Sequence, residues 1–280
     1  MVRVRIVAVA ILAATIAGCS SEPPVVQEAK KINEPVIKAP ELKVPAKPAK
    51  DEDAAAALVK DCLSAHSAGK PELIAKLKSC SYSRSGLIEM AGGRIRSTWK
   101  IQLLWPERYR VQFELQGSAI STTTFGKYPG GLWQYPGGPD KPEKGPIAAE
   151  MQPSFEAQLH EDSLSLLFLL NEPGTIVARA SDEKIDGVEL LGLHLWSPTL
   201  EYALVGIDKS TKLLRRIVYN GRELSTPVVK ELFFSSYQEF DGIKLGTRLL
   251  VKGGGRALAE WTEMKLDSKA AIDPASFEKP

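Results

Sequence analysis

The feature that most constrains this chain is an alternation of apolar and polar residues that begins after Ser79. It is clearest at residues 99–103, Trp-Lys-Ile-Gln-Leu, and at residues 111–115, Val-Gln-Phe-Glu-Leu. Such an alternation is typical of a β-strand with one buried and one solvated face. Later segments repeat the pattern less regularly, at residues 175–185, 188–196, 201–208, 212–220, 228–238, 243–252 and 257–266. The sequence therefore predicts a mainly β (α+β) chain built as an antiparallel meander.

Turns that carry glycine separate these segments, as hairpin connections require. We expect them at Gly92-Gly93, Gly117, Asp186-Gly187, Asn220-Gly221, Asp241-Gly242 and Gly253 to Gly255. About ten strands are too many for a flat open sheet, so we expect the sheet to curl. A strongly curved antiparallel sheet with one apolar concave face needs a cover.

The sequence predicts three helical segments, and the first and the longest of them can supply that cover. An alanine-rich run predicts a helix over residues 53–64, and Pro71 opens a second, short helix over residues 71–77. A longer helix is expected at residues 147–170, where apolar residues recur every four positions, and the Asn-Glu-Pro-Gly run at 171–174 stops it.

The N-terminus has the pattern of an export signal. Arg3 and Arg5 precede an apolar run at residues 6–17, which is shorter than the roughly 20 residues of a membrane-spanning helix. The run ends in Ile-Ala-Gly-Cys at 16–19, which resembles the lipobox of bacterial lipoproteins. That resemblance implies a lipoprotein signal peptide at residues 1–18 and acylation of Cys19, which would hold the mature chain at a membrane by lipid. The alternative is an ordinary secretory signal with a chance cysteine.

Residues 19–52 predict a disordered tether. The stretch from 20 to 50 contains six prolines and six lysines and lacks aromatic residues, so it cannot bury enough apolar surface to offset its ordering entropy. A contact of this tract with the cell wall or a partner is the alternative to a plain spacer. The remaining residues, 53–280, are enough for one domain with a core of its own.

Two cysteines remain once Cys19 is set aside. Cys62 and Cys80 form an even pair in an exported and therefore oxidising setting, so we expect a disulfide between them. Two buried thiols are the alternative, because spacing alone does not establish the geometry of a bridge.

The charge balance argues against nucleic-acid binding, and the spacing of the histidines argues against a metal site. Loss of Arg3 and Arg5 leaves 34 of the 36 basic residues against 34 acidic ones, so nothing steers nucleic acid to this chain. The three histidines, His66, His160 and His194, match no ligand spacing, and we expect neither a metal site nor a cofactor.

Several motifs occur in an order that is similar to that of a known protein family. They are Trp-Pro-Glu-Arg-Tyr-Arg at 105–110, Gly-Leu-Trp-Gln-Tyr-Pro at 131–136, Tyr237 followed by Asp241-Gly242-Ile243 and Leu245, and Asp-Pro-Ala-Ser-Phe at 273–277. In this order, with a leading helix and an inserted helix, the chain resembles the LolA/LolB superfamily of periplasmic lipoprotein carriers and receptors over residues 54–280.

The resemblance implies a half-open β-barrel with a helical lid over a hydrophobic cavity for acyl chains. The expected lining is Trp99, Ile101, Leu103, Val111, Phe113 and Leu115 from the strands, with Leu164, Leu167 and Phe168 from the lid. Each is equally consistent with filled core, because alternation identifies a buried face and not a void. In the soluble carriers an arginine near the cavity holds the lid closed; Arg108 and Arg110 are candidates here, without a secure alignment.

Two features depart from the pattern of the family: the anchor is absent from its soluble carriers, and one loop differs from that of its receptor. The expected lipid anchor matches the arrangement of the receptor LolB and of other anchored relatives. The loop at residues 127–145 is rich in proline and glycine and has no clear protruding leucine of the kind by which a lipoprotein receptor inserts lipid. The composition of this loop argues against a role in lipoprotein sorting and does not affect the expectation that the protein binds an apolar ligand.

We therefore expect a membrane-anchored, periplasm-facing protein that binds or transfers lipid or lipoprotein acyl chains, with Ser20 favouring the outer membrane. The alternative is an envelope sensor or scaffold, similar to RseB, that binds a protein partner. We expect no catalysis, because the sequence has no Gly-x-Ser-x-Gly elbow, no phosphate-binding glycine loop and no cysteine beside a histidine. The acidic pairs at 182–183 and 239/241 lie in expected turns, where solvated charge is usual.

Overall fold

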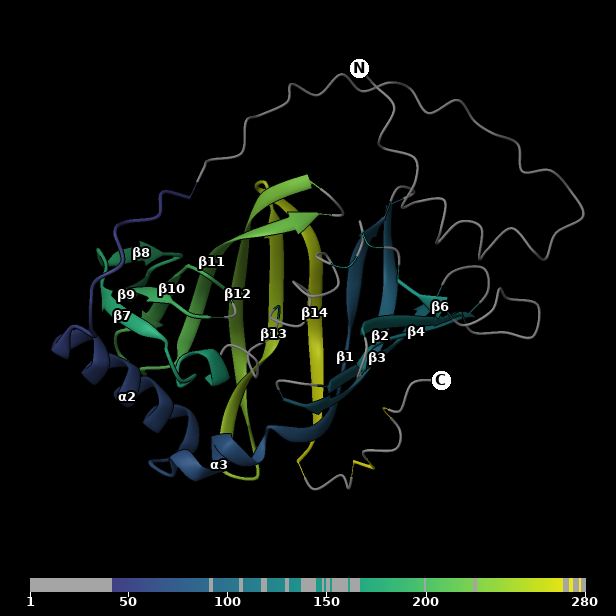
Figure 1. The fold of residues 1–280 in the computed structure, drawn as a ribbon, viewed down its shortest axis with the longest axis horizontal. Helices are drawn as coiled ribbons and strands as arrows, with labels where there is room; N and C mark the ends of the chain where they lie inside the picture. The colour runs from purple at the N-terminus through teal and green to yellow at the C-terminus, as the bar shows by residue number, and fades with distance from the viewer. Residues whose placement is uncertain are drawn as a thin grey trace, which may run out of the picture.

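The computed structural model describes residues 42–90, 93–105, 108–116, 120–128, 131–136, 145–147, 149, 152, 161, 167–198, 200–223, 226–268, 272–273 and 277. One 14-stranded antiparallel sheet dominates them (Figure 1). Its strands are β1 (Ser79–Met90), β2 (Gly93–Leu104), β3 (Arg108–Gln116), β4 (Ile120–Tyr128), β5 (Gly131–Pro136), β6 (Gly145–Pro146), β7 (Ile176–Arg179), β8 (Glu183–Ile185), β9 (Val188–Trp196), β10 (Ala203–Asp208), β11 (Leu214–Glu223), β12 (Thr226–Phe240), β13 (Ile243–Gly253) and β14 (Arg256–Asp267).

The strand order shows how the meander is assembled. It runs β6-β5-β4-β3-β2-β1-β14-β13-β12-β11-β10-β9-β7, with β8 beside β9. Most neighbours are consecutive hairpin partners, as the sequence predicts, whereas β1 and β14 come from opposite ends of the domain. Since the order ends in two different strands, β6 and β7, the described strands form an open sheet.

The pairing of β1 with β14 is the seam between the two halves of this sheet. Gly86 lies at a bulge in the seam, where the register shifts between Ser85 and Gly86. A Cβ at Gly86 would lie 2.1 Å from the carbonyl oxygen of Glu260 and 2.7 Å from the Cα of Trp261. Only glycine lets the two backbones approach so closely.

Helices α2 (Asp53–Ser67) and α3 (Pro71–Lys76) precede the sheet, close to the expected bounds. The buried residues of α2 recur every three or four positions, at Ala55, Leu58, Val59, Cys62 and His66, which places them on one stripe of the helix. Helix α2 contacts β7 and β13, and Figure 1 shows it beside the β7 end of the sheet. Ala68, with φ of 50°, and Gly69, with φ of 79°, end the helix.

The residues just before α2 belong to the fold. The backbone N–H of Glu52 donates to the carbonyl oxygen of Val177 at 3.0 Å, and the N–H of Val177 donates to the carboxylate of Asp51 at 2.9 Å. Both bonds satisfy groups of the edge strand β7, which would otherwise invite pairing with another chain. The expected tether at 19–52 therefore meets the domain before α2 begins.

The expected turns are confirmed at three hairpins and wrong at one. Asp186-Gly187 and Asp241-Gly242 have positive φ at both residues, as do Gly254 and Gly255, which is the requirement of a type I′ turn. Asn220-Gly221 is instead inside β11, which continues to Glu223. Gly92 and Gly117 lie outside the described residues.

The long helix expected at 147–170 is described only in part. Residue 152 and residues 167–169 are helical, and turns follow at 170 and 171. Residue 147 is not helical and residue 161 lies in a bend, so the prediction of one unbroken helix over 147–170 is wrong. The helical residues 167–169 end where the sequence predicts, and most of the segment lies outside the described residues.

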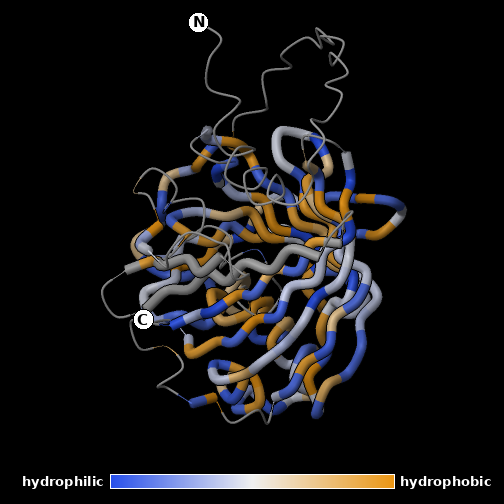
Figure 2. Tube along the Cα trace, turned by 90° about the vertical axis from the view of Figure 1, so that its right-hand side faces the viewer, coloured by the Kyte–Doolittle hydropathy of each residue, from blue (hydrophilic) through white to orange (hydrophobic). Residues whose placement is uncertain are grey.

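The core lies on one face of the sheet and contains side chains from both halves of the chain. Its cluster includes Cys62 from α2, Ile101 from β2, Leu167, Leu195 from β9 and Leu249 from β13. Figure 2 shows hydrophobic and hydrophilic residues interleaved along the strands, as the alternation requires. Within the described part of the chain, no helix has the length and hydropathy needed to cross a membrane.

Candidate functional site

The strand residues expected to line a cavity lie together on the apolar face. Cross-strand pairs join Trp99 to Phe113 and Ile101 to Val111. Ile101, Leu103 and Val111 are buried in one core cluster that also holds Leu167 and Phe168. Leu115 is buried opposite Ser97. Leu164 lies outside the described residues.

An aromatic row crosses this face at the seam of the sheet. The ring centroid of Trp99 lies 4.5 Å from that of Phe113 and 4.5 Å from that of Trp261, both in edge-to-face geometry. The indole N–H of Trp99 donates to the hydroxyl of Ser97 at 3.0 Å. Trp99 and Phe113 are only partly buried. The row is thus an apolar surface that the described residues do not cover completely.

A cluster of charged and polar side chains lies on the same face. Lys230 on β12 forms an ion pair with the carboxylate of Glu161, and the Tyr219 hydroxyl on β11 donates to the same oxygen, Oε1, at 3.1 Å. Arg84 on β1 donates from Nη1 to the backbone carbonyl of Glu161 at 3.1 Å. Side-chain exposure is 6% for Lys230 and 11% for Glu161, so this is a buried charge cluster.

Burial determines the chemistry of the cluster. A charged group in the interior is tolerated only when it is paired and hydrogen bonded. Burial, together with the Glu161 carboxylate, raises the pKa of Tyr219 well above its usual value, so the hydroxyl keeps its proton and acts as a donor. The guanidinium of Arg84 also stacks over the ring of Tyr82 at 5.6 Å, a cation–π contact on the same strand.

Local sequence explains how the sheet positions these groups. Tyr219 and Lys230 are direct cross-strand partners, so their side chains point to the same face. A Cβ at Gly221 would lie 2.9 Å from Cδ of Lys230 and 3.1 Å from Cε2 of Tyr219. The glycine therefore leaves room for the lysine stem inside β11, at the position where the Asn-Gly pair was expected to form a turn.

The polar cluster and the aromatic row meet at Arg84. Arg84 and Trp99 are opposite each other on β1 and β2, and Arg84 is opposite Met264 on β14. Strands β14 and β13 separate Arg84 from Lys230 in the sheet, and Glu161 contacts both cations. One face thus combines aromatic rings with buried cations.

The charged residues of this site were missed by the reasoning from sequence, although a signal was present. Arg84 follows Cys80 and Tyr82 in the inward phase of β1, and Lys230 precedes Leu232 and Phe234 in the inward phase of β12. A charge in the buried phase of an alternating strand is unusual and indicates a paired or functional group. Glu161 had no comparable signal.

The two arginines considered from the sequence lie elsewhere. Arg110 is opposite Gln102, in the phase of β3 that alternates with Val111, so it faces away from the apolar side. Arg108 lines a pocket at the end of the strands. A different arginine, Arg84, donates to the backbone carbonyl oxygen of Glu161.

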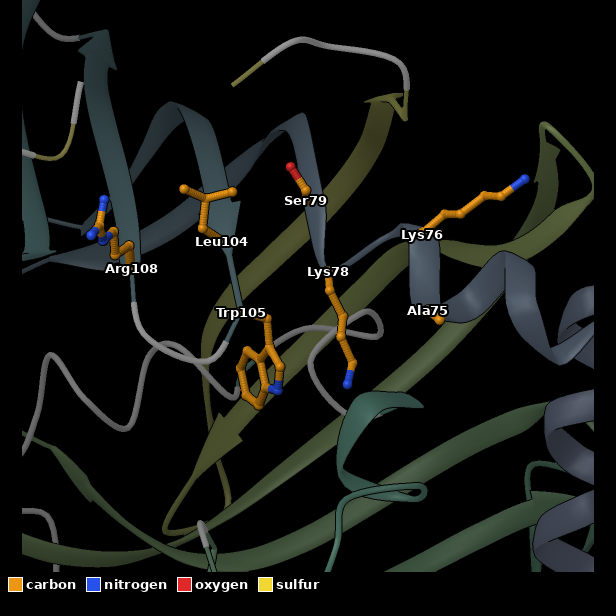
Figure 3. Close-up of a pocket in the computed structure, with 7 residues that line it drawn as sticks. All are labelled: Ala75, Lys76, Lys78, Ser79, Leu104, Trp105 and Arg108. Atoms are coloured by element: carbon orange, nitrogen blue, oxygen red, sulfur yellow. The ribbon is translucent and has the colours of Figure 1, made fainter. Parts of the chain in front are cut away.

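The pocket at Arg108 has a volume of about 690 Å³ and lies between α3 and the ends of β1 and β2 (Figure 3). Figure 3 shows Trp105 and Lys78 directed toward the helical turn of residues 167–169. The ring of Trp105 lies 5.4 Å from that of Phe168. The pocket at Arg108 shares no lining residue with the cavity expected from the sequence. It is lined by Ala75, Lys76, Lys78, Ser79, Leu104, Trp105 and Arg108.

The expected disulfide is not formed in the structure. Cys62 and Cys80 are both buried in the core and both remain thiols. Burial raises the pKa of Cys62 to about 12, which keeps it protonated and unreactive. Among the described residues, no group of three or more histidine, cysteine, aspartate or glutamate side chains is placed to hold a metal ion.

Comparison with known proteins finds similarity in fold. No protein-family model matches the chain, and no curated protein matches it. Among solved structures, an outer membrane lipoprotein-sorting type domain from Vibrio parahaemolyticus has a TM-score of 0.50 at 10% identity, covering 80% of this chain and 96% of that one.

Two further structures have TM-scores of 0.49. A LolA superfamily protein from Nitrosomonas europaea is 12% identical and covers 80% of this chain and 97% of its own. A DUF1329 family protein from Desulfovibrio piger is 17% identical and covers 76% of this chain and 97% of its own. The chain is therefore similar in fold to the outer membrane lipoprotein-sorting type domain.

Proposed function

We propose that this protein is a lipid-anchored envelope protein that holds an acyl chain, of a lipid or of a lipoprotein, against the apolar face of its sheet. The observation that carries the proposal is the aromatic row of Trp99, Phe113 and Trp261, in which Trp99 and Phe113 are only partly buried and which continues into the core around Leu167 and Phe168. Aromatic and aliphatic side chains with a few convergent polar groups are the usual lining of a site for an apolar ligand. The likeness to a lipoprotein-sorting domain agrees with this role.

In this proposal the sheet is a half-open barrel, and the segment with Glu161 and residues 167–170 covers its apolar side as a helical lid. Two contacts support the arrangement. Arg84 donates to the carbonyl oxygen of Glu161, and Trp105 packs against Phe168. A cover held by side-chain contacts can be displaced without breaking the hydrogen bonds between strands.

The anchor is the second part of the proposal. Cleavage after Gly18 and acylation of Cys19 would leave residues 19–52 as a tether between the outer membrane and the domain. We expect the full-length chain to fractionate with membranes and to incorporate palmitate, and Cys19→Ala to abolish both. Membrane association that survives this substitution would contradict the anchor.

The binding role is tested on the full-length chain with Cys19→Ala. Because this variant lacks the proposed acyl anchor, its purification is designed to avoid detergent, which would compete for an apolar site. The purified protein is extracted with organic solvent under native and denaturing conditions, and the released lipids are identified and quantified by mass spectrometry. We expect a stoichiometric acyl species under denaturing conditions and uptake of a fluorescent fatty acid by the emptied protein.

A matched pair of variants locates the site. Phe113→Ala removes a ring of the aromatic row, and we expect a loss of affinity of about tenfold for the fluorescent fatty acid. Phe233→Ala removes a ring from β12 that alternates with the inward Leu232 and so lies on the other face, and we expect no change. An empty extract together with no uptake would refute the acyl-binding role and favour a scaffold that binds a protein partner.

A further inference from the structure

We infer that the ligand of the apolar face has an anionic head group, a carboxylate or a phosphate, which replaces the Glu161 carboxylate at Lys230 and Tyr219. The inference rests on the proposed function and adds the chemical class of the ligand. It starts from the buried ion pair of Lys230 with Glu161, where Tyr219 donates to the same carboxylate oxygen.

The donors of this site are fixed, because both belong to the sheet. Tyr219 and Lys230 are cross-strand partners on β11 and β12, and each strand is hydrogen bonded on both sides, to β10 and to β13 respectively. Tyr219 is 1% exposed and Lys230 is 5% exposed. The position of the acceptor oxygen is therefore set before any ligand arrives, which is the preorganisation that a binding site requires.

The acceptor, in contrast, comes from outside the sheet. Glu161 belongs to no strand, so its carboxylate can leave the apolar face while every strand pairing stays intact. Lys230 then needs a new counter-charge, because a buried ammonium without a partner is strongly unfavourable. An anionic head group supplies both the charge and an oxygen that accepts from Lys230 and Tyr219.

The chain also makes room for this lysine. Gly221 is placed where a Cβ would lie 2.9 Å from Cδ of Lys230, so the strand omits a side chain beside the lysine stem. On the same face, Arg84 is opposite Trp99 of the aromatic row. Cations for a head group and rings for a tail therefore occur together, as an amphiphile with an anionic head requires.

The experiment compares ligands that differ only in the head. A fluorescent fatty acid bound to the full-length Cys19→Ala chain is displaced by palmitate, by hexadecyl phosphate or by the neutral hexadecanol. We expect at least one of the two anions to compete about tenfold or more better than hexadecanol, the ratio that a charge-assisted hydrogen bond supports. Whichever of palmitate and hexadecyl phosphate competes better identifies the head group as carboxylate or phosphate.

Variants assign the preference to the site. Lys230→Met should abolish the advantage of the anions, and Glu161→Gln, which removes the competing carboxylate, should increase it several-fold. Lys100→Met is the control, because Lys100 is 56% exposed in its side chain and pairs with Glu114; it should change nothing. If Lys230→Met fails to fold, the double variant K230M/E161M removes both charges of the pair together.

The outcomes separate the two proposals. Equal competition by hexadecanol and the anions overturns the head-group inference and leaves acyl binding intact. The head-group inference is also overturned if the anions keep their advantage in Lys230→Met or in the double variant. Failure of all three competitors, with no uptake of the fluorescent fatty acid, refutes the acyl-binding role itself.

Discussion

The imidazole of His66 on α2 accepts a hydrogen bond from the backbone N–H of Leu214 on β11, with 3.0 Å between Nε2 and the nitrogen. Its other nitrogen, Nδ1, lies 2.6 Å from the carbonyl oxygen of Lys244 on β13. Because a carbonyl only accepts, Nδ1 bears the proton and donates. The neutral ring thus ties α2 to two strands, and a second proton on Nε2 would remove the bond to Leu214.

This bond predicts that the fold loses stability in mild acid. Burial lowers the pKa of His66 to about 4 from the usual 6.5. Between these values the unfolded chain binds a proton that the folded chain does not bind, so the free energy of unfolding falls as the pH decreases. The loss from pH 7 to pH 5 is roughly 2 kcal/mol.

Urea denaturation at pH 7 and pH 5 measures this loss. His66→Gln is the comparison, because an amide can both donate and accept but does not titrate in this range. We expect His66→Gln to be less stable at pH 7 and to have a smaller difference between the two pH values. An equal difference in both proteins would show that other groups cause the acid sensitivity.

Gly221 gives a test of the interior of β11. A Cβ at this position would crowd the Lys230 stem at 2.9 Å, so Gly221→Ala should lower the free energy of unfolding by about 1–3 kcal/mol, the usual cost of overpacking. Asn220→Ala is the control, since Asn220 is exposed in the middle of the same strand, and it should change stability little. If Asn220→Ala were the more harmful substitution, a turn at 220–221 would explain it better than a strand.

The seam of the sheet predicts a larger effect at Gly86. A Cβ there would lie 2.1 Å from a backbone oxygen of β14, and backbone cannot rotate away as a side chain can. Gly86→Ala should therefore cost about 3 kcal/mol or more of stability, since the two halves of the sheet meet at this pairing. Ser83→Ala, on the same strand, should be close to neutral in thermal unfolding; a neutral Gly86→Ala would contradict the seam.

The thiol state of the two core cysteines can be counted directly. Cys62 and Cys80 are buried thiols, so in the Cys19→Ala chain a thiol reagent should label neither in the native state. Both should react after denaturation without reductant, because unfolding exposes them. Two labels per denatured chain would agree with the structure, and none would mean that the pair is oxidised to a disulfide.

Local patterns in the sequence determined most of the secondary structure. The alternation at residues 99–103 and 111–115 gave β2 and β3, because period-two burial is a property of neighbouring residues. Asp186-Gly187 and Asp241-Gly242 gave two hairpin turns, because positive φ is a local requirement. The alanine-rich run at 53–64 gave α2 to within three residues of its C-terminal end. Each of these features depends on residues that are close along the chain.

Tertiary structure alone decided what the apolar face contains. The pairing of β1 with β14 joins the two ends of the domain, and no local pattern specifies a partner so distant in sequence. The same pairing and its neighbours bring Arg84, Glu161 and Lys230 together, although 77 residues separate the first two and 69 the last two. Gly221 is another example. The Asn-Gly pair at 220–221 predicts a turn, and only the structure shows that Gly221 lies inside β11 beside the Lys230 side chain. A buried charge is defined by its partners, and its partners are known only once the chain has folded.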